Sequence, residues 1–395
     1  MEGFYLENTP LYEALVNNFE PRPRPRSGAT GTPSMVVSVR IRPFLDQDVT
    51  AGFPCASYPR TNQAGVLDIH DLYHHPKGRP VLKSYSYQVD NLFGPETTEQ
   101  EIYNSHMDDL VSLARNGGCG TIFAYGQTGS GKTYTISRLE QLVVESLVEK
   151  GASEERQVFL TIIELAGNQG YDLLSDRKPI SLLDNAAGVT QLGAEEHVVQ
   201  GRDEMMDAIE RATSFRRTKP TLKNDASSRS HSICRFRILD TQSGTSGFLY
   251  LIDLAGSEAA RDVAVHGPER MRETREINVS LSALKDCMRG KAKYDALAST
   301  TSESGTDGKQ KKPPYLPFRQ SALTRVLKHA LDPSVDGSKT RTMVIACVNP
   351  GLADVPMTRN TLSYAEMLCG TTPSPVVTTV ASSRVISSVN ASKRR

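Results

Sequence analysis

The feature that most constrains this chain is the segment from Gly126 to Thr133, which reads GQTGSGKT and fits GxxxxGK[ST] at every fixed position. An apolar run, Thr121–Tyr125, leads directly into it, and a stretch compatible with a helix follows. Glycines let backbone N–H groups turn inward around phosphate oxygens, and the start of a helix adds partial positive charge. The segment therefore predicts a nucleoside triphosphate site built as strand, loop and helix.

The last two residues of this segment have distinct expected roles. Lys132 is expected to bridge the β- and γ-phosphates, and the Thr133 hydroxyl to bind Mg²⁺. A glycine-rich turn without a ligand is the alternative, and the complete motif in this context disfavours it. The other loop residues expected to contact the nucleotide are Gln127, Thr128, Gly129, Ser130 and Gly131.

Two further segments suit a phosphate site, although each is weak alone. Asp253 follows the apolar run Phe248–Ile252 and starts the sequence DLAGSE, so its carboxylate is a candidate Mg²⁺ partner. Gly256 has no side chain to block its N–H from the γ-phosphate. The segment 224–231 reads NDASSRSH, and its hydroxyls around an arginine suit a phosphate-sensing loop. Ordinary polar turns are the alternative for both segments.

The fold class follows from apolar runs that alternate with helical patterns. Strands covered on both faces read as continuous runs of Ile, Val and Phe, and their alternation with helices predicts a three-layer αβα sandwich around a mixed, mostly parallel sheet. The expected strands are Gly120–Tyr125, Val158–Leu165, Ser232–Leu239, Phe248–Leu254 and Thr342–Val348. The expected helices are Thr98–Asn116, Tyr134–Glu149, Arg202–Phe215, Arg275–Met288 and Ser321–Ala330.

Composition along the chain predicts three regions. Residues 21–34 are rich in Pro and Arg and then in Gly, Ser and Thr, which predicts a linker, so ordered structure is expected to begin at Met35. We expect an N-terminal extension over 1–34, one large domain over 35–370 and a flexible neck or tail over 371–395. The polar stretch 298–314 is expected to form a mobile surface loop.

Charge, cysteines and hydropathy narrow the functional classes. A net charge of +1 gives no overall field for nucleic acid, so an acidic partner would need a local basic patch. The six cysteines are scattered, which predicts reduced thiols and no structural zinc. No apolar run is long enough to cross a bilayer, and the first 20 residues lack the pattern of a signal peptide. These features predict a cytoplasmic or nuclear protein with no membrane or nucleic-acid partner.

Taken together and in order, GQTGSGKT, NDASSRSH and DLAGSE resemble the P-loop, switch I and switch II of the kinesin motor family. The resemblance covers nearly the whole predicted core. Four more stretches carry it: RIRP at 40–43, EINVSLSAL at 276–284, LPFRQSALTR at 316–325 and NTLSYA at 360–365.

The resemblance implies a role for each matching residue. Arg40 and Pro43 would enclose the adenine, with Tyr134 nearby, and Asn224 would reach the nucleotide. Ser228 would complete the Mg²⁺ shell with Thr133, while Asp253 would hold the ion through water. Ser227 and the Gly256 N–H would meet the γ-phosphate, and an Arg229–Glu258 salt bridge would latch the switches. The implied cofactors are ATP or ADP with Mg²⁺. The implied catalytic residues are Lys132, Ser227, Ser228, Arg229, Gly256 and Glu258.

The resemblance also implies a partner, the acidic surface of a microtubule. The segment 306–341 carries eight basic residues against three acidic ones, which suits that surface. The alternative is that these residues form a solvated loop and helix face with no binding role. A second basic cluster is expected to face either solvent or the microtubule track. It consists of Arg216, Arg217, Lys219 and Lys223. The expected track contacts are Lys309, Lys311, Lys312, Arg319, Arg325 and Lys328.

The sequence departs from the kinesin pattern in three places. No insertion follows Thr135 in the helix after the P-loop, Gln320 replaces an aspartate, and Ala322 replaces a lysine in a segment expected to face the track. We expect an ATP-driven motor of the cytoplasm and cytoskeleton, on microtubules or the spindle. The alternative is a microtubule depolymerase or a non-walking ATPase, although the stretch 73–80 lacks the Lys-Val-Asp fingertip of depolymerising kinesins.

Overall fold

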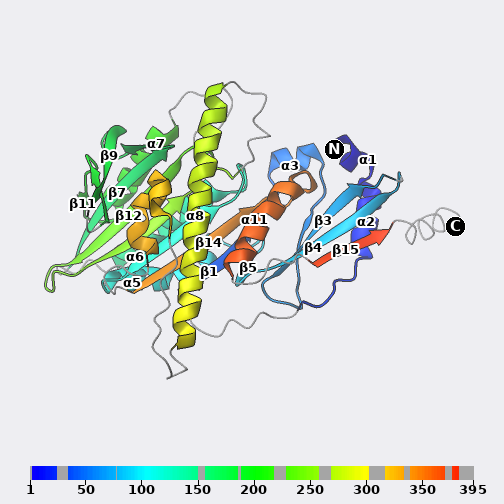
Figure 1. Cartoon of the computed structure of the whole chain (residues 1–395), viewed down its shortest axis with the longest axis horizontal. Helices are drawn as coiled ribbons and strands as arrows, with labels where there is room; N and C mark the ends of the chain where they lie inside the picture. The colour runs from blue at the N-terminus through cyan, green and yellow to red at the C-terminus, as the bar shows by residue number, and fades with distance from the viewer. Residues whose placement is uncertain are drawn as a thin grey trace. The chain divides into compact units, whose positions relative to one another are not determined.

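The chain forms two compact units in the computed structural model (Figure 1). One unit takes residues 1–30, 37–96 and 346–395, and the other takes 31–36 and 97–345. The structure describes residues 2–24, 34–76, 78–149, 156–185, 188–217, 228–257, 268–301, 316–332, 339–369 and 376–381.

The larger unit is built on a mixed sheet that contains the strand leading into the P-loop. Strand β6 (Cys119–Tyr125) pairs in parallel with β13 (Ser246–Asp253), and β12 (His231–Asp240) pairs antiparallel with both β13 and β7 (Arg156–Ala166). The order is β10-β9-β8-β7-β12-β13-β6-β14, so both expected phosphate-binding strand ends lie side by side. The other strands are β8 (Gln169–Asp172), β9 (Lys178–Asn185), β10 (Gly188–Leu192), β11 (His197–Val199), which pairs with β7, and β14 (Thr340–Val348).

Two sets of helices cover this sheet. Helix α6 (Lys132–Glu149) contacts β6 and β13 and also its neighbours α5 (Asp108–Arg115) and α7 (Arg202–Arg217). The long helix α8 (Pro268–Thr301, yellow in Figure 1) contacts α9 (Ala322–Val326) and α10 (Lys328–Leu331), and α10 also contacts β6. This arrangement is the expected three-layer α/β sandwich.

The absence of a side chain at Gly247 allows α5 to approach the sheet closely. A Cβ at Gly247 of β13 would lie 1.8 Å from the Ala114 carbonyl oxygen of α5. The backbone of the helix therefore rests directly on the strand.

The five expected strands and five expected helical regions are confirmed, with differences at their ends. The segment expected as one helix over Thr98–Asn116 contains α4 (Glu99–Ile102), a π-helical turn (Tyr103–Met107) and α5. The Thr98 hydroxyl caps it by accepting from the Glu101 N–H. The expected helix Ser321–Ala330 breaks at Leu327 into α9 (Ala322–Val326) and α10 (Lys328–Leu331). Helix α8 extends well beyond the expected Arg275–Met288 in both directions.

The smaller unit contains a parallel pair and a separate antiparallel sheet. Strand β1 (Met35–Ile41) pairs with β5 (Asn91–Phe93), and the sheet has the order β15-β4-β3-β2. Helix α11 (Val355–Leu368) contacts β3 and β4. The remaining elements of this unit are α3 (Asp46–Ala51), β2 (Ser57–Pro59), β3 (Val66–His74), β4 (Pro80–Gln88) and a short turn of 3₁₀ helix, Leu352–Asp354.

The N-terminal extension is folded against the smaller unit. Helices α1 (Glu2–Glu7) and α2 (Thr9–Asn17) bury Tyr12 and Leu15 completely, so the expectation that ordered structure begins at Met35 is wrong. Arg24, in the segment expected as a linker, forms a buried ion pair of 2.6 Å with Glu366 of α11.

The C-terminal region also contains structure where a flexible tail was expected. Strand β15 (Val376–Ala381) pairs antiparallel with β4 along its whole length. The first residues of the polar stretch 298–314, expected as a loop, belong to α8, which ends at Thr301. The rest of that stretch and the rest of 371–395 lie outside the described residues. Among the helices that the structure describes, none is both long and apolar enough to cross a membrane.

Candidate nucleotide site

The predicted P-loop has the expected strand–loop–helix geometry. All seven residues of β6 are buried, and α6 begins at Lys132. Gly129 and Gly131 adopt positive φ angles of 76° and 94°, a conformation that other residues rarely adopt. Loop and helix therefore have the shape that directs backbone N–H groups toward an anion.

The Lys132 side chain is folded over this loop. It is only 5% exposed, and its Nζ donates to the Gln127 carbonyl oxygen over 2.9 Å. The Ser130 hydroxyl donates to the same oxygen over 2.7 Å. Thr128 and Gly129 are exposed at the rim of the loop. Tyr134 is 50% exposed, with the Arg138 guanidinium 5.8 Å from its ring centre.

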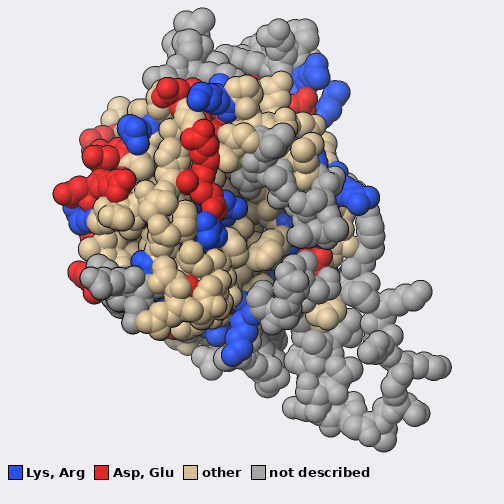
Figure 2. Space-filling view, turned by 90° about the vertical axis from the view of Figure 1, so that its left-hand side faces the viewer, with Lys and Arg blue, Asp and Glu red and all other residues tan. Residues whose placement is uncertain are grey.

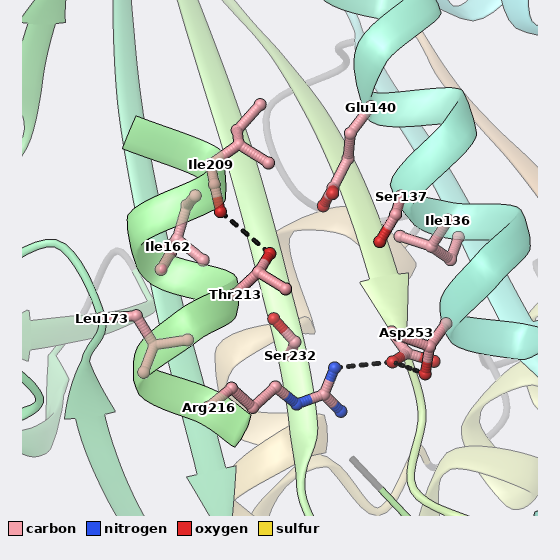
Figure 3. A pocket seen from close by; sticks show the side chains of 12 residues that line it. Ile136, Ser137, Glu140, Ile162, Leu173, Ile209, Thr213, Arg216, Ser232 and Asp253 are labelled. Atoms are coloured by element: carbon pink, nitrogen blue, oxygen red, sulfur yellow. Dashed lines mark hydrogen bonds and ion pairs between the residues drawn. The ribbon is translucent and has the colours of Figure 1, made fainter. Parts of the chain in front are cut away.

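Three side chains converge beside the first turn of α6. The Thr133 hydroxyl donates to Asp253 Oδ2 over 2.7 Å, and Arg216 Nη1 donates to the same oxygen over 2.6 Å. Asp253 Oδ1 is buried and has no hydrogen-bond partner among the residues that the structure describes. Figure 3 shows the Arg216 guanidinium pointing at Asp253 from the end of α7. The site thus combines a hydroxyl, a carboxylate and a buried cation.

Arg216 corrects one sequence prediction. It was expected to face solvent or track with Arg217, Lys219 and Lys223, but it is 6% exposed and anchored inside the site, where Nη2 also donates to the Ser230 carbonyl oxygen over 2.6 Å. Helical spacing could have found it. The buried positions of α7 are Met205, Ala208, Ile209, Ala212 and Arg216, which continue one face at i+3 and i+4 steps.

The donor set fits Mg²⁺. Hydroxyl and carboxylate oxygens are the protein ligands that this ion prefers, and Thr133 and Asp253 supply them next to the predicted phosphate loop. The unpartnered Oδ1 of Asp253 adds a buried acceptor, which a cation or its bound water would satisfy. Ser228, the third expected contributor, lies in the segment before β12 and is partly buried.

The two switch segments touch each other directly. The Gly256 N–H donates to the Ser228 carbonyl oxygen over 2.8 Å, and the Ser257 N–H donates to the Gly126 carbonyl oxygen over 3.1 Å. The Gly256 N–H that was expected to face the γ-phosphate is therefore used within the protein in this conformation. Its expected contact with phosphate stays a prediction that requires the Ser228 bond to open.

The expected latch between Arg229 and Glu258 lies partly outside the described residues, because Glu258 does. Arg229 itself approaches α8, with Nη1 3.6 Å from Glu273 Oε2. Asn224 and Ser227 also lie outside the described residues, so their contacts with nucleotide stay predictions.

His231 is a site residue whose role the sequence patterns did not predict. It is 1% exposed, its Nδ1 accepts from the Ala255 N–H over 3.0 Å, and its Nε2 donates to Ser280 Oγ of α8 over 2.8 Å. Burial, then the charges of Arg216 and Lys132, lower the pKa of His231 to about 3. A neutral imidazole therefore joins the segment after β13 to the long helix.

A small cavity lies behind Thr133 and Asp253. Its volume is about 30 Å³, and its walls come from α6, α7 and the sheet (Figure 3). Glu140 of α6 lines it, and the Cys234 thiol forms a hydrogen bond with the Glu140 carboxyl. Burial, and after it the Asp253 charge, raise the pKa of Glu140 to about 8, while the Arg216 charge acts in the opposite direction.

The expected adenine-binding residues belong to the smaller unit. Arg40 is 5% exposed near the end of β1, and Pro43 is exposed just after it. Their role at the adenine stays a prediction.

The expected track contacts are only partly described. Arg319 is exposed, Lys328 is half-buried, and Arg325 Nη2 donates to the Leu182 carbonyl oxygen of β9 over 2.9 Å. Lys309, Lys311 and Lys312 lie outside the described residues. Ala322 is 3% exposed, so the expectation that this position faces the track is wrong: it is the first residue of α9 and packs inward.

The fold and site define a P-loop nucleotide-binding protein of the α/β class. The kinesin motor domain family model matches residues 40–369, and the chain belongs to that family.

Several curated proteins share this similarity. The diatom spindle kinesin-1 of Cylindrotheca fusiformis is 33% identical over 73% of this chain and 43% of its own length. Kinesin-like protein KIN-13B of Arabidopsis thaliana is 32% identical over 84% of this chain and 46% of its own length. Mouse kinesin-like protein KIF24 is 32% identical over 91% of this chain and 25% of its own length. The chain therefore spans less than half the length of these relatives.

Proposed function

We propose that this chain hydrolyses ATP with Mg²⁺ and couples that reaction to movement of α8 on a microtubule, in the cytoplasm or on the spindle. The observation that carries the proposal is the continuous path from the Thr133–Asp253 pair to α8. Asp253 ends β13, Ala255 follows it, and the Ala255 N–H bonds to His231, which bonds to Ser280 of α8.

The chain's own residues account for binding and positioning. The loop N–H groups and Lys132 would hold the triphosphate, while Thr133 and Asp253 would hold Mg²⁺. The ion supplies charge neutralisation for phosphoryl transfer, which needs positioning and electrostatic stabilisation more than covalent help. Once the Gly256–Ser228 bond opens, Ser227 and the Gly256 N–H would position the attacking water, and Ser228 would complete the Mg²⁺ shell. The Arg216 charge beside Asp253 fixes where that carboxylate points.

The coupling follows from the same contacts. Opening the Gly256–Ser228 bond shifts the segment after β13, and the His231 bridge passes that shift to α8. Small changes at a nucleotide site are amplified when they bias a rigid element with two arrangements. Helix α8 suits this role because it spans 34 residues in one piece.

Surface charge favours one side of the molecule for an acidic track. Helix α7 lies on the left in Figure 1, the side that faces the viewer in Figure 2, where acidic side chains gather. That helix exposes Asp203, Glu204, Asp207 and Glu210, which would repel tubulin. Helix α8 instead exposes Met271 and Val279, which supports this helix, with the basic segment 306–341, as the docking surface.

The test is ATP turnover with and without microtubules, followed by surface gliding. We expect turnover to rise strongly on polymer, and Lys132→Ala to abolish it because the phosphate charge loses its partner. A rate indifferent to polymer would refute the coupling. Stronger stimulation by free tubulin dimers, with shrinking polymer ends, would favour the alternative of a depolymerase.

A further inference from the structure

A lysine continues the buried face of α8, and the mechanism above gives it no role. Lys291 follows a run of buried apolar positions spaced three or four residues apart: Ile277, Leu281, Leu284 and Met288. A long lysine stem usually carries its amine out to water, but Lys291 is only 1% exposed and its amine stays inside. Burying an amine is costly unless it meets a partner, so an apolar side chain would occupy this position at lower cost.

The amine of Lys291 is bound to the sheet. Its Nζ donates to the Thr340 hydroxyl over 3.2 Å, and Thr340 is the first residue of β14. The neighbouring strand β6 begins at the same edge, because the Cys119 N–H donates to the Lys339 carbonyl oxygen over 2.9 Å. The P-loop follows the other end of β6, which lies roughly 20 Å away along the strand. The lysine therefore holds α8 at the sheet edge opposite the nucleotide loop.

Two other contacts hold α8 at the nucleotide edge. Ser280 bonds to His231, and the Lys285 Nζ lies 5.0 Å from the centre of the Tyr125 ring at the end of β6. His231 and Tyr125 adjoin the switch and P-loop segments, where the proposed movement begins. The Lys291 contact lies roughly 17 Å along the helix axis from Ser280. It joins α8 to the sheet itself, so it is the contact that can stay fixed while the others shift.

A buried polar contact of this kind restricts how a helix can move. An apolar face packed on apolar strands can slip along its axis by one turn, about 5.4 Å, and still find apolar partners. Such a slip would carry the amine of Lys291 away from the Thr340 hydroxyl and leave both groups buried without each other. Single buried polar residues fix the register of coiled coils for the same reason. Rotation about the Lys291 contact keeps this bond, whereas sliding breaks it.

We propose that Lys291 is a positioning residue that fixes the register of α8 on the sheet, so that movement started at the nucleotide edge becomes a tilt about this contact and not a slide. The inference rests on the proposed function, because it concerns the helix assigned there to the track. Lys291 acts through Thr340 and does not touch the nucleotide. The tilt carries the N-terminal turns of α8, which expose Met271, through the widest arc.

The first test separates stability from coupling. Lys291→Met keeps the length of the side chain and removes the amine. We expect this variant to unfold at the same urea concentration as the wild type or a higher one, since a packed apolar group replaces a buried polar contact. Microtubule-stimulated turnover should nevertheless fall about threefold or more, because one buried hydrogen bond is lost, while basal turnover stays unchanged. Lys293→Met removes an exposed lysine of the same helix and is the matched control.

A partner variant tests whether the two side chains act together. Thr340→Val removes the hydroxyl and keeps the shape of the side chain. We expect it to lower stimulated turnover by itself, and we expect no further fall when it is combined with Lys291→Met, because both changes break the same bond.

The second test follows the helix without microtubules. Spin labels join exposed Asp207 of α7 either to Arg272, near the N-terminal end of α8, or to Arg289, near Lys291. The background replaces by serine the two cysteines that are not fully buried, Cys55 and Cys369. Between ADP and a non-hydrolysable ATP analogue, the wild-type distance to Arg272 should change and the distance to Arg289 should not. In Lys291→Met the distance to Arg289 should shift or broaden, by up to about the 5.4 Å of one helical turn.

Three results would overturn the inference. One is a Lys291→Met protein with the stimulated turnover of the wild type. Another is a distance to Arg289 that responds to nucleotide equally in the wild type and the variant. The third is a joint loss of basal turnover and of urea resistance in Lys291→Met, which would show a purely structural role. A wild-type chain whose turnover ignores microtubules, or whose distance to Arg272 ignores nucleotide, would instead refute the proposed function.

Discussion

Acid should loosen the bridge between the nucleotide site and α8 through one residue, His231. In the folded chain its Nδ1 accepts the Ala255 N–H, so a second proton on the ring would face a donor. The pKa of His231 is lowered to about 3, against an ordinary value near 6.5. Between these two pKa values His231 is protonated in the unfolded chain and neutral in the folded chain. The free energy of unfolding therefore decreases as pH falls through 6.5 toward 3.

The size of this effect follows from the two pKa values. Between about pH 7.5 and pH 5, a group moving from near 6.5 unfolded to about 3 folded removes roughly 2 kcal/mol of the free energy of unfolding. His70 of the smaller unit, whose pKa burial lowers to about 4, adds a similar loss, so the wild type alone does not isolate His231.

The assay is urea unfolding of the wild type and of His231→Asn at both pH values. Asn retains an acceptor for the Ala255 N–H and does not titrate, so every other group cancels in the comparison. We expect the wild type to lose roughly 2 kcal/mol more than the variant between the two conditions. Equal pH dependence in both proteins would refute the assignment of a neutral, buried imidazole at this position.

Three other changes test the fold and the site. Gly247→Ala should lower the free energy of unfolding by roughly 3 kcal/mol or more, because the new Cβ would meet the Ala114 carbonyl oxygen. Thermal unfolding measures this loss, and a melting temperature lowered by only a degree or two would contradict the close approach of α5. Tyr12→Ala should cost roughly 3–5 kcal/mol, since a fully buried ring is removed from the N-terminal extension; urea unfolding that matches the wild type would show that the extension is dispensable. Glu258→Ala should leave nucleotide binding intact and abolish microtubule-stimulated turnover, and normal turnover would rule out the latch with Arg229.

The sequence predicted the parts of the site that are contiguous. The P-loop lies within eight residues, and Asp253 ends an apolar strand, so local patterns were enough. Arg216 was misassigned because a basic cluster in sequence says nothing about which member faces inward; its ion pair with Asp253 forms across the fold. His231 was missed for the same reason, since its partners come from two other segments.

The edges of the fold were less predictable than its centre. The centre is specified by long apolar runs, whereas α1 and α2 span only six and nine residues. Their burial depends on a docking surface that local periodicity cannot reveal. Ala322 shows the same limit in reverse: a small side chain suits either an exposed or a packed position, and the structure packs it at the start of α9.

The pairing of β15 with β4 has a practical consequence for the choice of residues to express. A chain trimmed to residues 40–369 would keep the family match but lose β15 and both N-terminal helices. Strand β4 would then present a row of unpaired N–H and C=O groups, and unpaired edges of this kind recruit other chains. The segment that matches the family model is thus shorter than the segment needed to cover the edge of β4. A soluble product should therefore keep residues 2–24 and 376–381.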